Sequence, residues 1–384
     1  MTLHFDAAEY AARRARASAA VAGAGLDAVL LFAPESHYWL TGYDTFGFAM
    51  FQVMILTADG RAELLTRMPD LRQARHTSTL SEAQIHIWHE RQGATPGADL
   101  AQVLAMMGLA GGRIGIETQT VGLTDWNGRM VRDALGKALV EASDLVRALR
   151  RVKSPAEIAL HRKAAALSDD ALDAAIAATR PGAFEGDILA EMQGAVFRGG
   201  GDYAGNEFVI GSGPAALLCR YFSGRRHLDA VDQVTLEWSG AYGRYHAAMM
   251  RTLIIGQAEP RHRRMHAACC EAIEACEAAI RPGQPMGAVY AAHARVFDAH
   301  GFSHARLQAC GYGMGAVYNP IWVDFPMFFE GNPQLMQAGQ VFFLHMILMD
   351  SSAGLAMCLG HSVLVTDTGV ERLSRRALDL VICR

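Results

Sequence analysis

One carboxylate stands inside a strand-like run in the second half of the chain. The segment Gln233–Gly256 (QVTLEWSGAYGRYHAAMMRTLIIG) predicts two strands joined at a tight, glycine-containing corner. Glu237 lies in the first of these strands. A buried carboxylate is costly unless it is paired or put to use. Glu237 is therefore a candidate general base, or an anchor for a cationic group.

Histidines and one cysteine supply further reactive groups. His246 and His345 titrate near neutral pH and can shuttle a proton. Cys358, with His345 or His361 nearby, would form a nucleophile pair. Each has a structural alternative: Cys358 as a small buried strand residue, and the histidines as internal hydrogen-bonding groups. The sequence leaves both interpretations open.

Other side chains suit ligand binding. Arg220 follows the glycine-rich turn Gly211–Gly213 and offers a forked donor for a carboxylate; the alternative is a surface arginine beside Arg225 and Arg226. The turn is not a phosphate loop, because no GK[ST] follows it. Aromatic faces can hold a delocalised cation; the candidates are Phe46, Tyr318 and Trp322.

The bulk properties describe a buried globular protein. The 384 residues are 51% hydrophobic and 19% charged, and this length predicts two domains. A net charge of −4 provides no basic field for nucleic acid. No run approaches the roughly 20 apolar residues that span a bilayer. The opening MTLHFDAAEY lacks a signal pattern and the seven cysteines form no CxxC pair, so we expect a cytoplasmic protein without nucleic-acid or membrane partners.

The first half alternates between helical and strand-like patterns, which predicts an α/β domain ending near Arg150. The expected helices are 7–24 and 126–135, and the expected strands are 28–32, 51–57, 61–66 and 113–117. Residues 36–43 (SHYWLTGY) are predicted as an aromatic loop. Tyr43 and Phe46 belong to this aromatic region and are either core residues or a wall over a small ligand.

The second half begins with a strong helix start. In Lys153–Glu157 (KSPAE), Ser154 and Glu157 make a capping box and Pro155 fits the first turn, followed by an apolar stripe up to residue 180. Further helices are expected at 187–197, 261–280 and 285–300. Further strands are expected at 208–210, 341–348 and 360–366.

The corner segment resembles a pattern of the pita-bread metallopeptidase and amidohydrolase superfamily: D-x-G, a tyrosine, then D-x-x-R-T. The resemblance implies a creatinase-like N-terminal α/β domain (1–150) followed by a pita-bread catalytic domain of α+β type (151–384). It also places the superfamily's five metal-binding positions, which here hold Glu237, Ala248, Tyr312, His345 and Gly360. One carboxylate and one imidazole do not replace a dinuclear ligand set. We therefore expect no metal and no other cofactor.

Within this superfamily, two phrases are similar to the metal-free ectoine hydrolases. LEWSGAYGRYH (236–246) resembles F-E-I-A-G-x-Y-x-R-Y-H, and GYGMGAVYNPIW (311–322) resembles G-Y-P-I-G-x-x-Y-P-P-x-W. The resemblance implies opening of a cyclic amidine by water. By position it marks Glu237 and His345 as catalytic candidates, and Tyr43, Phe46, His246, Tyr312, Tyr318 and Trp322 as substrate contacts. The substituted slots add His361 and Cys358 as catalytic candidates and Arg220 as a substrate contact. Departures are Arg220 in place of a histidine, and Cys358 and His361 where a glutamate is expected.

The sequence thus predicts a metal-independent hydrolase that acts on a C–N bond of a small cyclic amidine, amide or zwitterionic compatible solute. Two alternatives stay open: a lyase or creatinase-like amidinohydrolase on another small zwitterion, and an inactive ligand-binding homologue. A metallo-aminopeptidase is not expected. The two-domain plan of the superfamily implies a homodimer.

Overall fold

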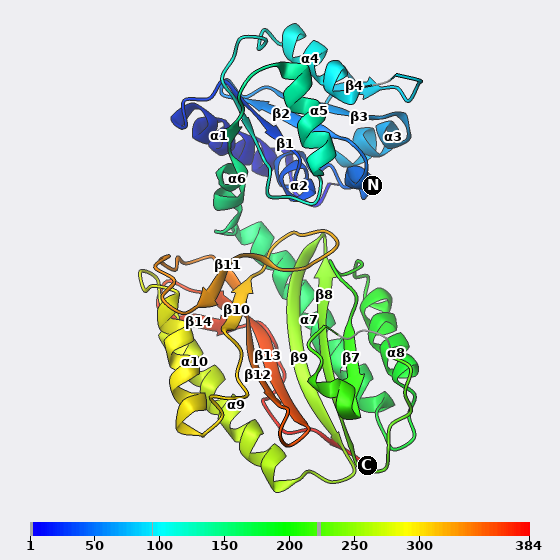
Figure 1. The fold of residues 1–384 in the computed structure, drawn as a ribbon, viewed down its shortest axis with the longest axis vertical. Coiled ribbons are helices and arrows are strands. Elements are labelled where there is room, and N and C mark those ends of the chain that lie inside the picture. Colours follow the sequence, from blue (N-terminus) through cyan, green and yellow to red (C-terminus); the bar gives the residue numbers. More distant parts are fainter. Residues whose placement is uncertain (1–2, 94, 221–223) are drawn as a thin grey trace. The chain divides into compact units, whose positions relative to one another are not determined.

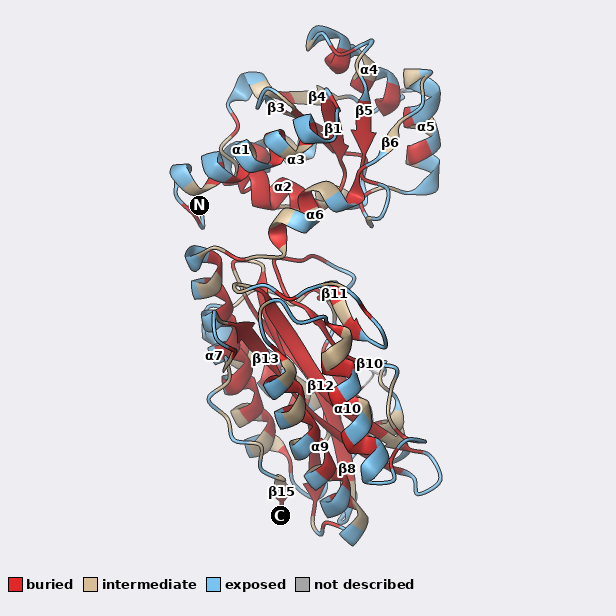
Figure 2. Ribbon diagram, turned by 90° about the vertical axis from the view of Figure 1, so that its left-hand side faces the viewer, coloured by how far each residue is buried: buried red, intermediate tan, exposed pale blue. Residues whose placement is uncertain are grey.

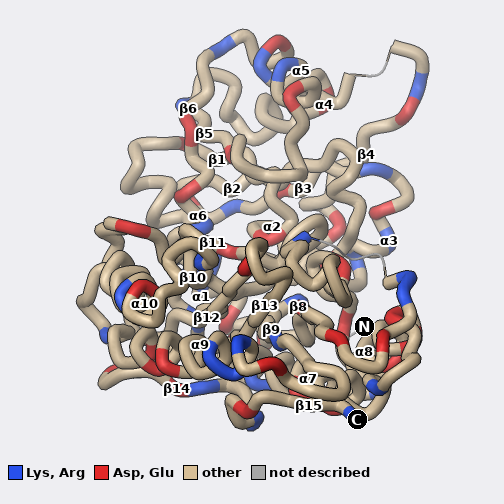
Figure 3. The backbone as a smooth tube through the Cα atoms, turned by 60° about the horizontal axis from the view of Figure 1, so that its bottom comes forward, with Lys and Arg blue, Asp and Glu red and all other residues tan. Residues whose placement is uncertain are grey.

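The computed structural model describes residues 3–93, 95–220 and 224–384, and the chain divides into two compact units, 1–150 and 151–384 (Figure 1). Each unit has its own sheet. Among the described residues, no helix combines the length and the apolar character that crossing a bilayer requires. Lysine, arginine, aspartate and glutamate are interspersed along the chain (Figure 3).

The first unit is built on a six-stranded mixed sheet in the order β4-β3-β2-β1-β5-β6. Its strands are β1 (Ala28–Leu31), β2 (Val53–Thr57), β3 (Ala62–Arg67), β4 (Ile85–Trp88), β5 (Ile114–Ile116) and β6 (Val140–Glu141). Its helices are α1 (Ala7–Gly23), α2 (Pro34–Thr41), α3 (Met68–Thr77), α4 (Pro96–Met106), α5 (Asp125–Leu135) and α6 (Ser143–Arg150), with short 3₁₀ turns at Gly47–Ala49 and Glu82–Gln84. Two apolar clusters fill its two faces, one under α1, α2, α3 and α6, the other under α4 and α5.

The prediction of an aromatic loop at 36–43 is wrong, because all of these residues up to Thr41 belong to helix α2. Pro34 begins the helix and Gly42, in the left-handed conformation at φ +84°, ends it. The buried carboxylate of Glu117 accepts the N–H groups of Phe32 and Ala33 and the hydroxyl of Ser36 at the helix start. Such contacts with a distant residue are invisible in the local sequence.

The second unit is built on a nine-stranded sheet whose main path runs β11-β10-β12-β13-β9-β8-β7, with β14 paired to β13 and β15 to β9. Its strands are β7 (Val209–Ser212), β8 (Asp232–Tyr242), β9 (Tyr245–Ile255), β10 (Ala309–Gly313), β11 (Asp324–Phe329), β12 (Val341–Asp350), β13 (Leu355–Val365), β14 (Val370–Arg372) and β15 (Ile382–Cys383). Its helices are α7 (Pro155–Ala178), α8 (Glu185–Arg198), α9 (Pro260–Ala279) and α10 (Gly287–Ala299), with a 3₁₀ turn at Gly213–Leu217. The central strands β9, β12 and β13 are buried along almost their whole length (Figure 2).

Helix α7 starts as its sequence predicts. The Ser154 side chain accepts the N–H of Glu157, and the Glu157 carboxylate accepts the N–H of Ser154, which completes the capping box. The other oxygen of Glu157 accepts the hydroxyl of Tyr245, 2.6 Å away, at the start of β9. The capping residue therefore also ties the helix to the central hairpin.

Strands β8 and β9 form that hairpin, and its two faces have different neighbours. The turn uses Gly243 and Arg244, both at positive φ. Trp238 points toward α7 and donates its indole N–H to the carbonyl of Ser168. Side chains alternate between the faces of a strand, so the adjacent Glu237 points to the opposite face. That face carries the cavity described next.

Candidate active site

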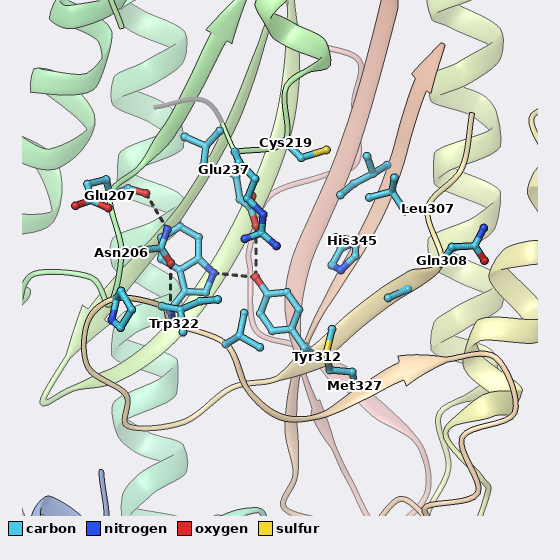
Figure 4. Close-up of a pocket in the computed structure, with 17 residues that line it drawn as sticks. Asn206, Glu207, Cys219, Glu237, Leu307, Gln308, Tyr312, Trp322, Met327 and His345 are labelled. Carbon is cyan, nitrogen blue, oxygen red and sulfur yellow. Dashed lines mark hydrogen bonds between the residues drawn. The ribbon is translucent and has the colours of Figure 1, made fainter. Parts of the chain in front are cut away.

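A cavity of about 570 Å³ lies on the sheet face opposite helices α7 and α9, within the usual size range of small-molecule sites (Figure 4). Strands β7, β8, β10 and β12 contribute to it, together with the loops around 206, 219 and 321. Its polar lining residues are Asn206, Glu207, Cys219, Arg220, Glu237, Gln308, Tyr312, Trp322 and His345. Five of the eleven sequence-predicted site residues line this cavity: Arg220, Glu237, Tyr312, Trp322 and His345.

The strand register explains why Glu237 and His345 share this face. Glu237 pairs with Val209 on one side and with Met250 on the other, Met250 pairs with Gly360, and Gly360 pairs with His345. Paired residues point to the same face of a sheet. One row across five strands therefore carries the carboxylate and the imidazole into one cavity.

Glu237 ends a short chain of hydrogen bonds. The indole N–H of Trp322 donates to the hydroxyl oxygen of Tyr312 at 2.8 Å, and that hydroxyl donates to Oε1 of Glu237 at 3.4 Å (Figure 4). An indole N–H can only donate, so it directs the Tyr312 proton toward the carboxylate. Among the described residues, Tyr312 is the only hydrogen-bond partner of the Glu237 side chain.

Burial sets the electrostatics of the site. It raises the pKa of Glu237 to about 7, against the opposing effects of the Arg220 charge and the Tyr312 hydrogen bond. Burial also lowers the pKa of His345 to about 4 and raises that of Tyr312 well above its usual value. Near neutral pH, Glu237 is therefore present in both forms, while His345 is neutral and Tyr312 keeps its proton.

Several lining residues were not identified from the sequence. Asn206 accepts the backbone N–H of Trp322 at 3.2 Å and donates to the carbonyl of Glu207 at 2.9 Å. Cys219 faces the cavity as a thiol, since burial and the charge of Glu237 raise its pKa. Gln308 accepts the hydroxyl of Tyr290 at 3.2 Å. They lie on loops or at strand ends, where no sequence period marks the pocket side.

The expectation that His361 faces the pocket is wrong. His361 pairs with Leu344 in the register, and Leu344 packs in the apolar cluster under α9. Its Nε2 lies 2.7 Å from Oε1 of Glu277 on α9, and Arg372 binds the same carboxylate. His361 therefore belongs to a hydrogen-bonded cluster with Glu277 and Arg372 on the helix side of the sheet.

Cys358 is a small buried residue of strand β13, as the structural alternative predicted. It is 1% exposed, belongs to an apolar cluster, and is not among the residues that line the cavity. Burial raises its thiol pKa well above the usual value, whereas a nucleophilic cysteine needs a lowered one. The proposed nucleophile pair with His345 or His361 is not supported.

His246 and Tyr318, two predicted substrate contacts in the second unit, make internal contacts with neighbouring loops instead. His246 is fully buried: its Nε2 accepts the N–H of Gly205 at 2.8 Å, and its Nδ1 lies 2.7 Å from the carbonyl of Arg244. Tyr318 is buried beneath the guanidinium of Arg244, 5.0 Å from its ring centre. Neither is among the residues that line the cavity.

The two candidates in the first unit differ from each other. Tyr43 is 1% exposed, stacks near His37, and donates its hydroxyl to Gln52, so it is a core residue and the expected ligand wall does not include it. Phe46 is 85% exposed on its own unit. Its predicted ligand contact stays a prediction.

The residues at the five expected metal positions do not fit a dinuclear centre. Ala248 has no ligand atom, and the residues that the structure describes contain no group of three or more His, Cys, Asp or Glu side chains placed to hold a metal ion. At Gly360, an added Cβ would lie 2.9–3.0 Å from the ring of Phe343 and 2.7 Å from the carbonyl of Leu344. An aromatic ring thus fills the space that a glutamate ligand would need.

Family models match both units. Residues 13–152 match the creatinase/prolidase N-terminal domain, and residues 159–367, more than half of the chain, match metallopeptidase family M24. The chain belongs to the M24 family. This is a family of hydrolases, and the two matches confirm the expected creatinase-like first domain and pita-bread second domain.

Curated relatives of the chain differ in activity. The ectoine hydrolase of Halomonas elongata is 25% identical over 97% of both chains, and the probable dipeptidase PepE of Mycobacterium tuberculosis is 28% identical over 88% of this chain and 87% of its own. The crystal structure of PepE from Mycobacterium ulcerans superimposes with a TM-score of 0.86 at 26% identity, covering 98% of this chain and 99% of that one. Because the relatives differ in activity, they leave the substrate of this chain open.

Proposed function

We propose that this chain is a metal-independent hydrolase that opens a C–N bond of a small cyclic amidine or amide, with Glu237 as the general base. The observation that carries the proposal is the half-buried carboxylate of Glu237, which lines a cavity and has one hydrogen-bond partner among the described residues and a pKa of about 7. A base works best when its pKa lies near the operating pH. The ectoine hydrolase of Halomonas elongata supports the choice of substrate class.

The substrate enters as a protonated amidine, and both protons of the attacking water must reach its leaving nitrogen. Ionised Glu237 takes a proton from a water molecule as the water oxygen adds to the amidine carbon. The protonated acid then gives that proton to the ring nitrogen, and as the C–N bond breaks the hydroxyl proton of the adduct passes through the regenerated Glu237 carboxylate to the released amine, which leaves an amide and a protonated amine. Atoms and charges balance without a metal ion.

Other groups of the cavity bind and orient the substrate. The guanidinium of Arg220 suits a substrate carboxylate, and the indole face of Trp322 suits a delocalised cation. The Tyr312 hydroxyl donates to Oε1 of Glu237, which leaves Oε2 to take the proton from water. His345, neutral at pH 7, offers a donor or an acceptor at the opposite wall.

Metal independence rests on the side chains at the metal positions. A dinuclear hydrolase needs oxygen-rich ligands around both ions, and here Ala248 and Gly360 provide none. Elemental analysis of the purified protein tests this directly. Zinc, manganese or iron at two ions per chain, lost together with activity on chelation, would overturn the proposal.

The decisive experiment compares the native enzyme with Glu237→Gln on ectoine, hydroxyectoine and creatine, following amine release by NMR. We expect turnover of a cyclic amidine by the native enzyme and a loss of at least ~10³-fold in Glu237→Gln, the scale of losing an essential catalytic group. Binding of the same compounds, followed by calorimetry, should persist in both proteins. Binding without turnover in the native enzyme would indicate a ligand-binding homologue.

We further expect a homodimer, as the superfamily resemblance implies. Light scattering of the full chain measures its mass directly. A monomer at micromolar concentration would contradict this expectation without affecting the proposed chemistry.

A further inference from the structure

His246 links the central hairpin to the loop before β7. Its Nδ1 lies 2.7 Å from the carbonyl of Arg244, which can only accept, so this nitrogen carries the proton. Its Nε2 is then the acceptor for the N–H of Gly205, at 2.8 Å. Both bonds require the neutral ring, and burial keeps it neutral by lowering the His246 pKa to about 4.

Gly205 and Asn206 carry this link to Trp322. The Asn206 side chain accepts the N–H of Trp322 and donates to the carbonyl of Glu207, and these two partners leave only one orientation for the amide. Gly205 contacts the same stretch: an added Cβ would lie 3.0 Å from the backbone of Ile321 and of Trp322. The loop before β7 is therefore packed and hydrogen-bonded against the backbone of Trp322.

Trp322 lies in the connection between β10, which ends at Gly313, and β11, which starts at Asp324. In a connection of this length, the position of an indole depends on what holds its backbone. The indole N–H is the donor that directs the Tyr312 hydroxyl toward Glu237. The contacts thus run unbroken from His246 to the candidate base.

We propose that His246 and Asn206 are positioning residues, which hold Trp322 so that its indole N–H orients Tyr312 toward Glu237. This inference rests on the proposed function in taking Glu237 as the catalytic base. It gives His246 a role different from the substrate contact that the sequence suggested. It also assigns a role to Asn206, which the sequence did not mark.

The test measures the titration of Glu237 itself, so it needs no substrate. Infrared difference spectra between pH 5 and 9 report the carboxylic acid C=O band, and the band absent in Glu237→Gln is assigned to Glu237. Every variant keeps the groups that interact with this carboxyl, which are Cys219, Arg220, Tyr312 and Cys358, and also Glu207 and His345, which line the same cavity.

Two matched variants probe His246. His246→Leu fills the space without an acceptor, whereas the amide oxygen of His246→Gln stands near the position of Nε2 and can accept the Gly205 N–H. The Tyr312 hydrogen bond lowers the pKa of Glu237. Losing one such bond, worth about 1 kcal/mol, should raise the titration midpoint by about half a unit to one unit in His246→Leu. The midpoint of His246→Gln should stay near the native value.

Asn206→Leu provides a second variant at a half-buried position, should His246→Leu fail to fold, and it should raise the midpoint in the same direction. An unchanged midpoint in folded His246→Leu and Asn206→Leu would overturn the inference, because a purely structural role lowers stability without moving the titration. An equal shift in His246→Gln and His246→Leu would overturn it too, since the Gly205 bond would then be irrelevant.

Turnover separates this inference from the proposed function. With ectoine as the probe, we expect kcat to fall about tenfold in His246→Leu and Asn206→Leu with KM little changed, because a mispositioned base weakens transition-state stabilisation. If the native enzyme does not hydrolyse ectoine, hydroxyectoine or creatine, the proposed substrate class fails. The midpoint shifts then still decide whether His246 and Asn206 position Glu237.

Discussion

Glu237 and Glu277 are two carboxylates on opposite sides of the same sheet, and their surroundings differ sharply. Glu277 accepts Nε2–H of His361 at 2.7 Å and two N–H groups of Arg372 at 2.6 and 2.7 Å. Burial raises its pKa, but these bonds outweigh the effect and bring it below the usual value. Glu237 has one long hydrogen bond from Tyr312 among the described residues, and its pKa rises to about 7. A carboxylate whose desolvation is compensated by several hydrogen bonds and a nearby cation stabilises the fold. An undercompensated carboxylate, with too few such partners, is available for chemistry when it lies beside a cavity.

The first prediction removes the charge of Glu277, the carboxylate with several hydrogen-bond partners. Glu277→Gln should lower the free energy of unfolding by roughly 1–3 kcal/mol, because one oxygen is lost as acceptor for the buried His361 while the half-exposed Arg372 stays solvated. Urea denaturation at pH 7 measures the loss. Turnover per folded molecule should stay close to the native value, since Glu277 lies on the helix side. A stable variant with lost activity would reverse the assignments of the two carboxylates.

The second prediction concerns how the stability cost of Glu237 depends on pH. Its folded pKa, about 7, lies above the ordinary value of 4.5, so the folded state favours the protonated form. Ionisation therefore destabilises the fold as pH rises from about 4.5 to 7, and the cost is complete above pH 7. Glu237→Gln removes it. This variant should match native stability at pH 4.5 and exceed it by on the order of 2–3 kcal/mol at pH 8.

Urea unfolding of both proteins at the two pH values measures this difference. Glu277→Gln serves as the control of opposite sign, because Glu277 has a lowered pKa and its contribution is lost only as the pH falls. Equal stability of native protein and Glu237→Gln at pH 8 would show that the buried carboxylate carries no ionisation cost.

The same comparison shows what the sequence could establish. Capping signals and apolar periods located α7 and the hairpin strands, because those features are local: Ser154 and Glu157 lie three residues apart. Local patterns could not distinguish His345 from His361. Both lie in buried strands, and only the pairing of Leu344 with His361 places them on different faces.

The cavity was predictable only where a family motif marked it. Glu237 and Tyr312 stand in recognisable phrases and line the cavity. Asn206 and Cys219 line it through loop geometry, which depends on distant packing such as the contact of Gly205 with residue 321. Tyr43 shows the converse: the family resemblance implied a substrate contact, yet its hydroxyl donates to Gln52 inside its own domain.

The third prediction sharpens the role of the single hydrogen bond to Glu237. Tyr312→Phe removes that bond and the acceptor of the Trp322 N–H. The kinetic pKa of Glu237 should rise by about half a unit to one unit for a bond of roughly 1 kcal/mol, and turnover at pH 7 should fall about two- to fivefold as the ionised fraction drops. The pH profile of kcat/KM measures both. Raising the pH should restore part of the activity, whereas a uniform loss at all pH values would mean that Tyr312 acts directly on substrate.

The last prediction tests whether a thiol competes with Glu237 as the reactive group. Cys358→Ala should change turnover by less than about threefold, because burial raises the pKa of this thiol and its side chain lies outside the cavity. Its backbone N–H donates to the hydroxyl of Thr252 at 2.8 Å, a bond that the substitution keeps. Stability should fall by about 1 kcal/mol for the lost sulfur atom in a packed core. A loss of activity as large as that expected for Glu237→Gln would instead make Cys358 the nucleophile, and the undercompensated carboxylate would become its supporting base.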